Sequence, residues 1–401
     1  MILWVMPDAG ANSKAHYRSF VERFLREYPG AEVSVRVLTR NILWKKIFTL
    51  KYPAAGESVP DVIQIPHYWT ALLTRAGVAE NLSRLDPGMS LSEALFPLRA
   101  HCCKPGTKDL YSYPWWFDMS ALHYRADHLR RVTKNPEEAL STWEGLLDVC
   151  ARLREYFKDA EGYYPMQNSD WRGSLSTRST FTAVWGRGAD LFDADLRKAQ
   201  LSSEPFKQGV RDYIELALRE YMPILRERGS LGTMISGKAS MLISRKQGGA
   251  SFEGKSAVRI KTLPVPRTGA QPQAYLSGMN LMMNVAGKDK ETALAFIKWC
   301  ARPDNQLHYA ADMDVFPAFE ESFEKLVFSS SRRLQTYSGI LASARTLPNI
   351  TITGTVVEIL NRVLAVAATQ IVEGRFTQAG LDIELDKAAR ETDYLLSLYE
   401  G

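Results

Sequence analysis

The sequence predicts an α/β protein with two domains and mostly parallel sheets. Three observations support this fold class. Short apolar runs alternate with amphipathic stretches of about ten to fifteen residues, which is typical of βαβ units. The length of 401 residues favours two hydrophobic cores. No single linker rich in Pro and Gly divides the chain, so we expect the chain to cross between the domains more than once.

The first hundred residues alternate between strand and helix patterns. The predicted strands of this part are Ile2–Met6, Glu32–Leu38 and Asp61–Ile65. The predicted helices are 17–28, Asn41–Lys51 and Tyr68–Gly77. In an open parallel sheet, ligands bind beyond the carboxyl ends of the strands, so the segments that follow these strands are candidates for a binding site.

The remainder of the chain mixes strands with many helices. A capping box at Ser141–Glu144 predicts the start of a helix that runs to about Phe157. The other predicted helices are Leu175–Gly186, 205–228, Lys290–Ala301, Asn305–Ala311, Phe323–Phe328, Arg333–Arg345, Thr355–Gly374 and Leu381–Leu398. The predicted strands are Leu110–Trp116, Met119–Tyr124, Met241–Ser244, Val258–Leu263 and the longer extended segment Ala274–Val285.

Composition and charge exclude several classes of protein. The 50 basic and 45 acidic residues give a net charge of +5, and both signs are mixed along the chain, so a nucleic-acid-binding surface is not expected. No run of about 18 consecutive apolar residues is present, so no membrane span is expected. The four cysteines lack metal-ligand spacing, and we expect buried free thiols.

Motifs for catalysis, metals and cofactors are weak or missing. The segment Gly232–Lys238 matches a phosphate-binding loop, but Ala239 stands where the Mg²⁺-binding hydroxyl is required. The six histidines show no ligand spacing and no nucleophile motif occurs. We therefore expect no metal, no cofactor and no catalytic residues.

Aromatic and polar residues cluster at the predicted strand ends. They form three segments, Pro66–Trp69, Pro114–Asp118 and Asp170–Trp171. Aromatic faces next to carboxylates suit sugars, whose C–H faces pack on rings while their hydroxyls require hydrogen-bond partners. Core packing of these rings is an equally good interpretation from the residues alone.

The chain resembles the extracellular solute-binding proteins of ABC-type sugar importers, the maltose-binding-protein-like family 1. The match runs in order over nearly the whole chain. Its motifs are Pro60–Ile65 with Trp69, Tyr113–Asp118, Leu122–Asp127, Thr142–Glu144, Trp185–Gly186, Asp190–Asp193, Gly237–Met241, Leu263–Pro266, Ser277–Asn280, Phe296–Trp299, Tyr309 and Phe316–Ala318.

The resemblance implies a two-lobed periplasmic-binding-protein fold, with a hinge of three crossovers. The N-terminal lobe would hold residues 1–118 with about 260–315. The C-terminal lobe would hold 119–259 with much of about 316–401. Each lobe would be a mostly parallel sheet flanked by helices.

The resemblance also implies the ligand-binding residues. Asp118 falls at a sugar-binding carboxylate of the family, and Gly354 falls where a stacking Trp is expected, which disfavours malto-oligosaccharides. Together with the aromatic segments, the expected ligand-binding residues are His67, Tyr68, Trp69, Trp115, Trp116, Asp118, Asp170, Trp171, Gln247, Gly278 and Asn280.

The implied function is the substrate-binding component of an ABC importer. It would bind a carbohydrate, such as an oligosaccharide, in the cleft between the lobes and deliver it to a membrane permease by hinged closure, as a monomer without catalysis. The location would be periplasmic or membrane-tethered and extracytoplasmic. Because the first residues do not form a signal peptide, we expect that the signal sequence has been removed.

Two alternatives remain open. One is a glycoside hydrolase or lyase with an aromatic-lined cleft, which would turn over an oligosaccharide. The other is a binding protein for a non-sugar anionic solute. Arg172, Arg178 and Arg187 near the second-lobe loop keep an anionic sugar open as well.

Overall fold

The chain folds into two compact units in the computed structural model. The first consists of Met1–Asp118, Ser277–Ser330 and Thr346–Gly354, and the second of Met119–Leu276, Ser331–Arg345 and Thr355–Gly401. The structure describes residues 1–7, 13–53, 56, 58–168, 175–224, 231–245, 258–269, 273–328 and 332–399. The two-domain α/β fold class predicted from the sequence is confirmed.

The division of the chain differs in detail from the prediction. The first unit ends at Asp118, where the sequence places the end of the first lobe, but the chain returns at Ser277 and not near 260. The later return follows from strand pairing, because β8 (Ile260–Leu263) pairs with β5 (Ala121–Arg125) in the second unit. Beyond residue 330 the units exchange two further short segments, so the chain passes between them more than the predicted three times. Whether the units act as closing lobes stays a prediction.

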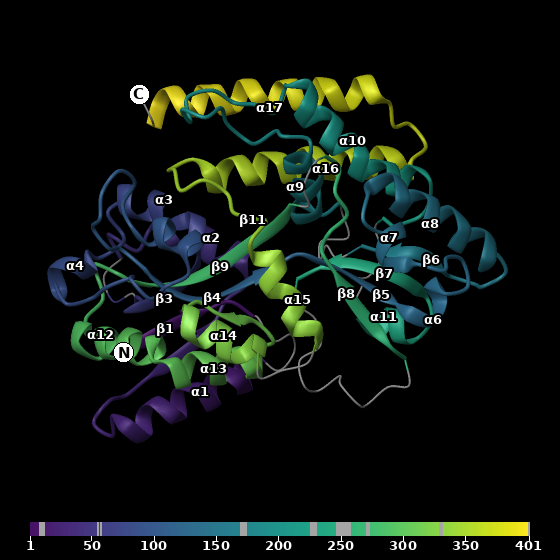
Figure 1. The fold of residues 1–401 in the computed structure, drawn as a ribbon. Helices are drawn as coiled ribbons and strands as arrows, with labels where there is room; N and C mark the ends of the chain where they lie inside the picture. The colour runs from purple at the N-terminus through teal and green to yellow at the C-terminus, as the bar shows by residue number, and fades with distance from the viewer. Residues whose placement is uncertain are drawn as a thin grey trace. The chain divides into compact units, whose positions relative to one another are not determined.

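The sheet of the first unit places three strand ends at one edge. Its strand order is β10-β4-β9-β3-β1-β2 (Figure 1). The strands are β1 (Ile2–Val5), β2 (Ser34–Val37), β3 (Val62–Pro66), β4 (Tyr113–Met119), β9 (Ala274–Met283) and β10 (Phe316–Pro317). Because β1 pairs in parallel with both β2 and β3, the chain leaves all three strands at the same carboxyl edge.

Helices cover both faces of this sheet, with α1 and α12–α14 on one face and α2 and α3 on the other (Figure 1). Their bounds are α1 (Ser13–Glu27), α2 (Arg40–Ile47), η2 (His67–Trp69), α3 (Thr70–Arg75), α4 (Leu82–Leu85), α5 (Phe96–Arg99), η3 (Ala100–Cys102), α12 (Lys290–Ala301), α13 (Pro303–Met313) and α14 (Glu320–Phe328). Side-chain caps define where several of these helices begin. At the start of α2, for example, the Thr39 hydroxyl oxygen accepts a hydrogen bond from the Ile42 backbone N–H.

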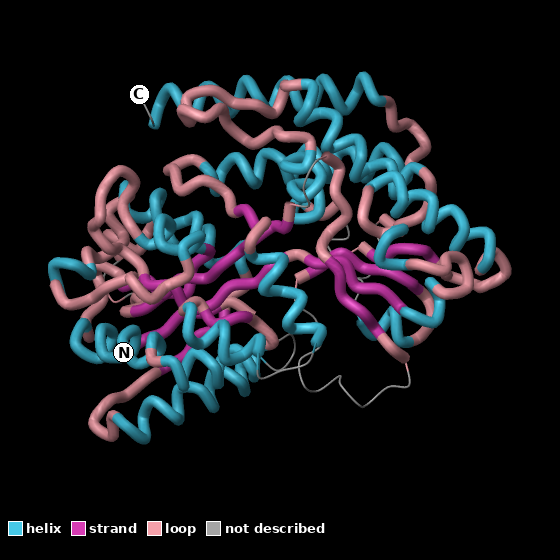
Figure 2. The backbone as a smooth tube through the Cα atoms, in the orientation of Figure 1, coloured by secondary structure: helices cyan, strands magenta, loops and turns pink. Residues whose placement is uncertain are grey.

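The sheet of the second unit is mainly antiparallel. Its order is β6-β7-β5-β8, with β6 (Tyr164–Gln167) and β7 (Ala239–Ser244) parallel. Figure 2 draws the strands of both sheets in magenta. However, β5 pairs antiparallel with both β7 and β8, so the predicted mostly parallel sheet is wrong here. The strand β5 runs opposite to both of its neighbours because the chain enters this sheet at β5 directly from β4 of the other sheet, and no β-α-β crossover of the second sheet sets its direction.

The second unit contains most of the remaining helices. They are α6 (Ala126–Leu129), α7 (Pro136–Ala139), α8 (Trp143–Tyr156), α9 (Thr177–Gly186), α10 (Glu204–Leu218), α11 (Leu231–Ile235), α15 (Arg332–Leu341), α16 (Thr353–Val372) and α17 (Gln378–Tyr399). The predicted helix 205–228 is too long, because α10 ends at Leu218 and Glu220 adopts a φ of 53°. The predicted helix Arg333–Arg345 ends early, because Ala344–Arg345 forms β11 and pairs with the start of β9.

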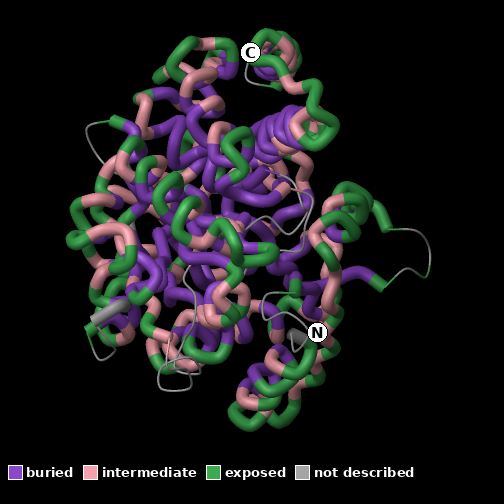
Figure 3. Tube along the Cα trace, turned by 90° about the vertical axis from the view of Figure 1, so that its right-hand side faces the viewer, coloured by how far each residue is buried: buried purple, intermediate pink, exposed green. Residues whose placement is uncertain are grey.

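One helix, α16, is long and apolar enough to cross a membrane by length and composition. Its buried side chains recur three and four residues apart, as in Val356, Leu360, Val363, Leu364 and Ala367. Such a stripe is typical of a helix that packs on a core, and in Figure 3 buried segments run through the interior while exposed ones lie along outer helix faces. We therefore assign this helix to the protein core.

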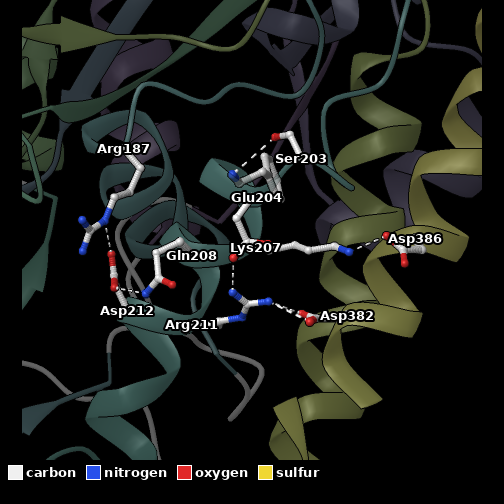
Figure 4. A network of polar contacts seen from close by, with 10 residues as sticks. Arg187, Ser203, Glu204, Lys207, Gln208, Arg211, Asp212, Asp382 and Asp386 are labelled. Carbon is white, nitrogen blue, oxygen red and sulfur yellow. Dashed lines mark hydrogen bonds and ion pairs between the residues drawn. The ribbon is translucent and has the colours of Figure 1, made fainter. Parts of the chain in front are cut away.

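Charge pairs attach the C-terminal helix α17 to α10 (Figure 4). Arg211 donates from Nη2 to both carboxylate oxygens of Asp382, at 2.7 and 2.8 Å. One turn away, Lys207 forms an ion pair with Asp386 at 2.7 Å. Charge-assisted hydrogen bonds are stronger than neutral ones, and these pairs therefore help to fix the register of α17 against α10.

Buried His128 predicts a pH-dependent stability. Its Nδ1 lies 2.8 Å from Ser240 Oγ, and burial, assisted by the charge of Arg125, lowers the pKa of His128 to about 4. In the unfolded chain His128 takes up a proton near pH 6.5, whereas in the folded chain it does so only near pH 4. The contribution of His128 to the free energy of unfolding is therefore unchanged above pH 6.5 and becomes unfavourable as the pH falls from 6.5 towards 4.

We expect the free energy of unfolding, measured by urea titration, to decrease between pH 6.5 and 4, and to decrease less in His128→Gln. His101 contributes in the same direction, because burial lowers its pKa well below the usual value. The control is the half-buried His308, which lies beside Asp312 on α13, and His308→Gln should keep the wild-type loss. An identical slope in His128→Gln and the wild type would contradict this assignment.

Candidate functional site

A cluster of one arginine and three aromatic residues lies at the carboxyl edge of the first unit's sheet. Arg40 begins α2 just after β2, and Tyr68 and Trp69 lie in η2 just after β3. The Arg40 guanidinium carbon lies 5.7 Å from the Tyr68 ring centroid and 5.4 Å from that of Trp69. Its Nη2 also donates to Tyr68 Oη at 2.7 Å. This edge cluster brings together a cation and two flat apolar faces.

Trp44 of α2 completes the edge cluster. Its ring centroid lies 4.8 Å from that of Trp69, and the two planes are tilted by 51°. Gly354 packs against the same indoles, since a Cβ at this position would lie only 3.2 Å from Trp69 Cδ1. The space beside Gly354 is therefore filled by the two tryptophans of the edge cluster.

Both ring nitrogens of His67 contact other residues of the first unit. It is fully buried, the Gly278 backbone N–H donates to its Nδ1 at 2.8 Å, and its Nε2 lies 2.6 Å from Thr346 Oγ1. The same Nδ1 also lies 2.9 Å from the Gly278 carbonyl oxygen. His67 thus connects the segments at Gly278 and Thr346, and its predicted contact with a ligand stays a prediction.

Asn280 and Gly278 contact other residues inside the first unit. Asn280 is 1% exposed, and its Nδ2 donates to the His101 carbonyl and to Ser112 Oγ, both at 2.9 Å. A Cβ on Gly278 would lie 3.2 Å from Leu98 Cδ2, so glycine permits close packing there. Their roles as ligand-binding residues stay predictions.

The predicted break between the strands Leu110–Trp116 and Met119–Tyr124 is wrong, because the whole segment Pro114–Asp118 lies within β4. Trp115 is 1% exposed, and its ring centroid lies 4.3 Å from that of Tyr309 and 6.0 Å from that of Phe20. Trp116 and Asp118 alternate with it along the strand and are also buried. The structure therefore places Trp115 in the aromatic core of the first unit.

Three of the expected ligand-binding residues, Asp170, Trp171 and Gln247, lie outside the described residues, as does Arg172. The other two arginines considered for an anionic ligand are engaged within the second unit. Arg187 donates to Asp212 at 2.7 Å, and the guanidinium carbon of Arg178 lies 5.2 Å from the Tyr275 ring centroid.

A second arginine–aromatic cluster lies in the second unit. Tyr275 stacks on Trp185 with centroids 5.5 Å apart and planes 13° from parallel, and the Arg345 guanidinium carbon lies 5.2 Å from the Trp185 centroid. The Asp190 carboxylate accepts hydrogen bonds from Trp185 Nε1 at 3.1 Å and from Arg345 Nη2 at 2.7 Å. These contacts stabilise the pairing of β11 with β9.

Sequence reasoning missed Arg40 and Trp44 at the candidate site. One signal was available, since Arg40 comes three residues after the strand that ends at Val37 and therefore starts at the ligand-binding edge of the sheet. In the part of the chain that the structure describes, no group of three or more His, Cys, Asp or Glu residues is arranged to hold a metal ion.

Comparisons with known proteins identify relatives. A family model for bacterial extracellular solute-binding proteins matches residues 19–335. The sn-glycerol-3-phosphate-binding periplasmic protein UgpB of Salmonella typhimurium is 22% identical over 288 residues, which cover 67% of this chain. UgpB of Pectobacterium atrosepticum is 20% identical over 328 residues, 76% of this chain and 70% of that protein. The match to the Salmonella protein spans 63% of its length.

Solved structures share the fold over almost the whole chain. A solute-binding protein from Thermotoga lettingae bound with α-D-tagatose has a TM-score of 0.82 at 17% identity and covers 99% of both chains. An ABC substrate-binding protein from Listeria monocytogenes in complex with cycloalternan has a TM-score of 0.82 at 13% identity, covering 99% of this chain and 98% of that one. Maltose-bound MalE3 of T. maritima has a TM-score of 0.80 at 20% identity, covering 98% and 100%. These likenesses show the fold.

Proposed function

The chain belongs to the family of bacterial extracellular solute-binding proteins, and from this premise we propose that it is the substrate-binding component of an ABC importer that binds a carbohydrate. The edge cluster supports the proposal, because it places Arg40, the half-buried Trp44 and the buried rings of Tyr68 and Trp69 together at the ligand-binding edge of the sheet. The ligands named for the similar structures, tagatose, cycloalternan and maltose, support a carbohydrate.

A thermal-shift screen tests this function. The panel contains neutral and uronic mono- and oligosaccharides, and we expect at least one of them to raise the melting temperature in proportion to the logarithm of its concentration. Isothermal titration then gives the dissociation constant. If none of the panel stabilises the protein, carbohydrate binding is wrong.

We also propose that binding occurs without catalysis. A glycoside hydrolase or lyase would convert the stabilising oligosaccharide into shorter products, whereas a transport protein returns it unchanged. Chromatography of the oligosaccharide after prolonged incubation distinguishes the two, and we expect no new product. Accumulation of shorter sugars in proportion to protein concentration would favour the enzyme.

An anionic solute such as a phosphate ester is the second candidate. Two observations favour it: Arg40 stands at the ligand-binding edge of the sheet, and the curated relatives are named for sn-glycerol 3-phosphate. Titration with sn-glycerol 3-phosphate tests it. Saturable binding of this ester, without binding of any sugar in the panel, would make the second candidate the better one.

Delivery requires a membrane permease as the partner, which we infer from the importer function. The family is extracellular, which supports a location outside the cytoplasm after removal of a signal sequence. The monomeric state is also a proposal, and light scattering of the purified protein tests it. Asp118 and the other ligand-binding residues expected from the sequence are kept as proposals for mutagenesis.

A further inference from the structure

A row of aromatic residues begins on α2 and continues into the turns that follow this helix. Trp44, Phe48 and Tyr52 are spaced four residues apart, and their exposure increases outwards from the half-buried Trp44 to 45% at Phe48 and 80% at Tyr52. The Phe48 ring meets Trp44 edge-on, with centroids 5.0 Å apart. We call these three residues, together with Lys45, Lys46 and Lys51, the α2 surface.

The charge of this segment is one-sided. No acidic residue occurs between Glu32 and Glu57, while five basic residues do, at Arg36, Arg40, Lys45, Lys46 and Lys51. Among the described residues the three lysines form no ion pair. Some lysines elsewhere in the first unit are paired, as Lys290 is with Glu80 and Lys298 with Asp86. Within the part of the chain that the structure describes, the α2 surface is therefore a cluster of positive charge without a paired carboxylate.

The α2 surface is continuous with the edge cluster. Trp44 belongs to both, because its ring packs on Trp69 on one side and on Phe48 on the other. From Arg40 to Phe48 the helix advances about 12 Å at 1.5 Å per residue. A ligand that begins at Arg40 and follows this row must therefore be longer than a single sugar ring.

The chemistry of the edge cluster and of the α2 surface favours one class of ligand. Ring faces favour the C–H faces of sugars, and unneutralised lysines favour negative charge, so the ligand must carry both along its length. We propose that the solute is an acidic oligosaccharide, with one carboxylate bound by Arg40 and its following units lying along the α2 surface. This inference depends on the proposed carbohydrate-binding function and specifies its substrate class.

Calorimetric titration with matched ligands tests the charge. The probes are mono-, di- and trisaccharides of galacturonic, glucuronic and mannuronic acid, each with a neutral counterpart in which the carboxylates are reduced to hydroxymethyl groups. We expect at least one acidic trisaccharide to bind ten- to a hundredfold more tightly than its neutral counterpart, the range for one charge-assisted hydrogen bond. Its affinity should fall as salt concentration rises.

Variants test the two parts separately. Arg40→Gln should reduce the preference for the acid over its neutral counterpart about tenfold or more, and Arg40→Lys should restore part of it. Two double variants test the α2 surface, Lys45→Gln/Lys46→Gln and Phe48→Ala/Tyr52→Ala. Each should weaken binding of the acidic trisaccharide but not binding of the monosaccharide. Matched controls in the second unit are Lys158→Gln/Lys387→Gln and Tyr156→Ala/Tyr394→Ala, whose side chains are similarly exposed. These controls should bind like the wild type.

Each outcome separates the inference from the proposed function. If a neutral sugar binds as tightly as its acidic counterpart, the acidic substrate is wrong while carbohydrate binding stands. If the monosaccharide binds as tightly as the trisaccharide, or if the α2 variants bind like the controls, the path along α2 is wrong. If no sugar binds, the proposed function itself fails. Melting temperatures of all variants show whether a loss arises from unfolding.

Discussion

Replacing Trp115 with alanine should destabilise the protein by about 3–5 kcal/mol, the range for deleting a large aromatic side chain from a packed core. The indole is 1% exposed and lies among Tyr309, Tyr17 and Phe20, with ring centroids 4.3, 6.2 and 6.0 Å away. Alanine would leave a cavity that this sheet and the helices α1 and α13 cannot fill without moving. Urea denaturation measures the loss.

The same position separates a core role from the ligand-binding role expected from the sequence. Trp115→Phe keeps an aromatic ring in the core, so we expect it to fold with a smaller loss and to bind solute with wild-type affinity. Phe48→Ala offers a contrast, because Phe48 is exposed and its removal should change stability by less than about 0.5 kcal/mol. Wild-type stability of Trp115→Ala together with weaker solute binding would restore the ligand-binding role.

Strand patterns explain why most of the first unit was predictable, while β4 was predicted only in part, from Tyr113 to Trp116. The segments Ile2–Met6, Glu32–Leu38 and Asp61–Ile65 are short apolar or alternating runs, and the structure contains a strand in each. All seven residues of Tyr113–Met119 are buried, so no alternation of polar and apolar residues marks this strand. The prediction therefore ended one strand at Trp116 and began the next at Met119, and the aromatic and polar residues at this supposed break were interpreted as ligand contacts.

The candidate site was predictable only where the sequence alone places a residue at a strand end. Tyr68 and Trp69 follow β3 directly, and the edge of the sheet on which they lie follows from the strand pattern. Arg40 and Trp44 depend on pairing between distant segments, because only the parallel register of β1 with β2 and β3 brings α2 beside η2. His67 illustrates the converse, since its partners Gly278 and Thr346 are more than 200 residues away in sequence.

Gly209→Ala should separate α9 from α10 and destabilise the second unit, although alanine is the better helix former. A Cβ at Gly209 would lie 2.5 Å from Val184 Cα and 2.8 Å from Val184 N. Because these are backbone atoms, no change of rotamer relieves the clash and the helices must move apart. Overpacking of this kind costs about 1–3 kcal/mol or more, and the helix propensity of alanine returns at most about 1 kcal/mol.

The expected result for Gly209→Ala is therefore a net loss of about 1–2 kcal/mol in urea denaturation, with a larger loss for Gly209→Val, because valine adds volume and forms helices less well. Gly339 of α15 is the matched control, since it is also helical but has no atom within 4 Å of its hypothetical Cβ. Gly339→Ala should stabilise the protein by about 0.5–1 kcal/mol through the same propensity. If both alanine variants are equally stabilising, the contact with Val184 does not control how closely α9 and α10 pack.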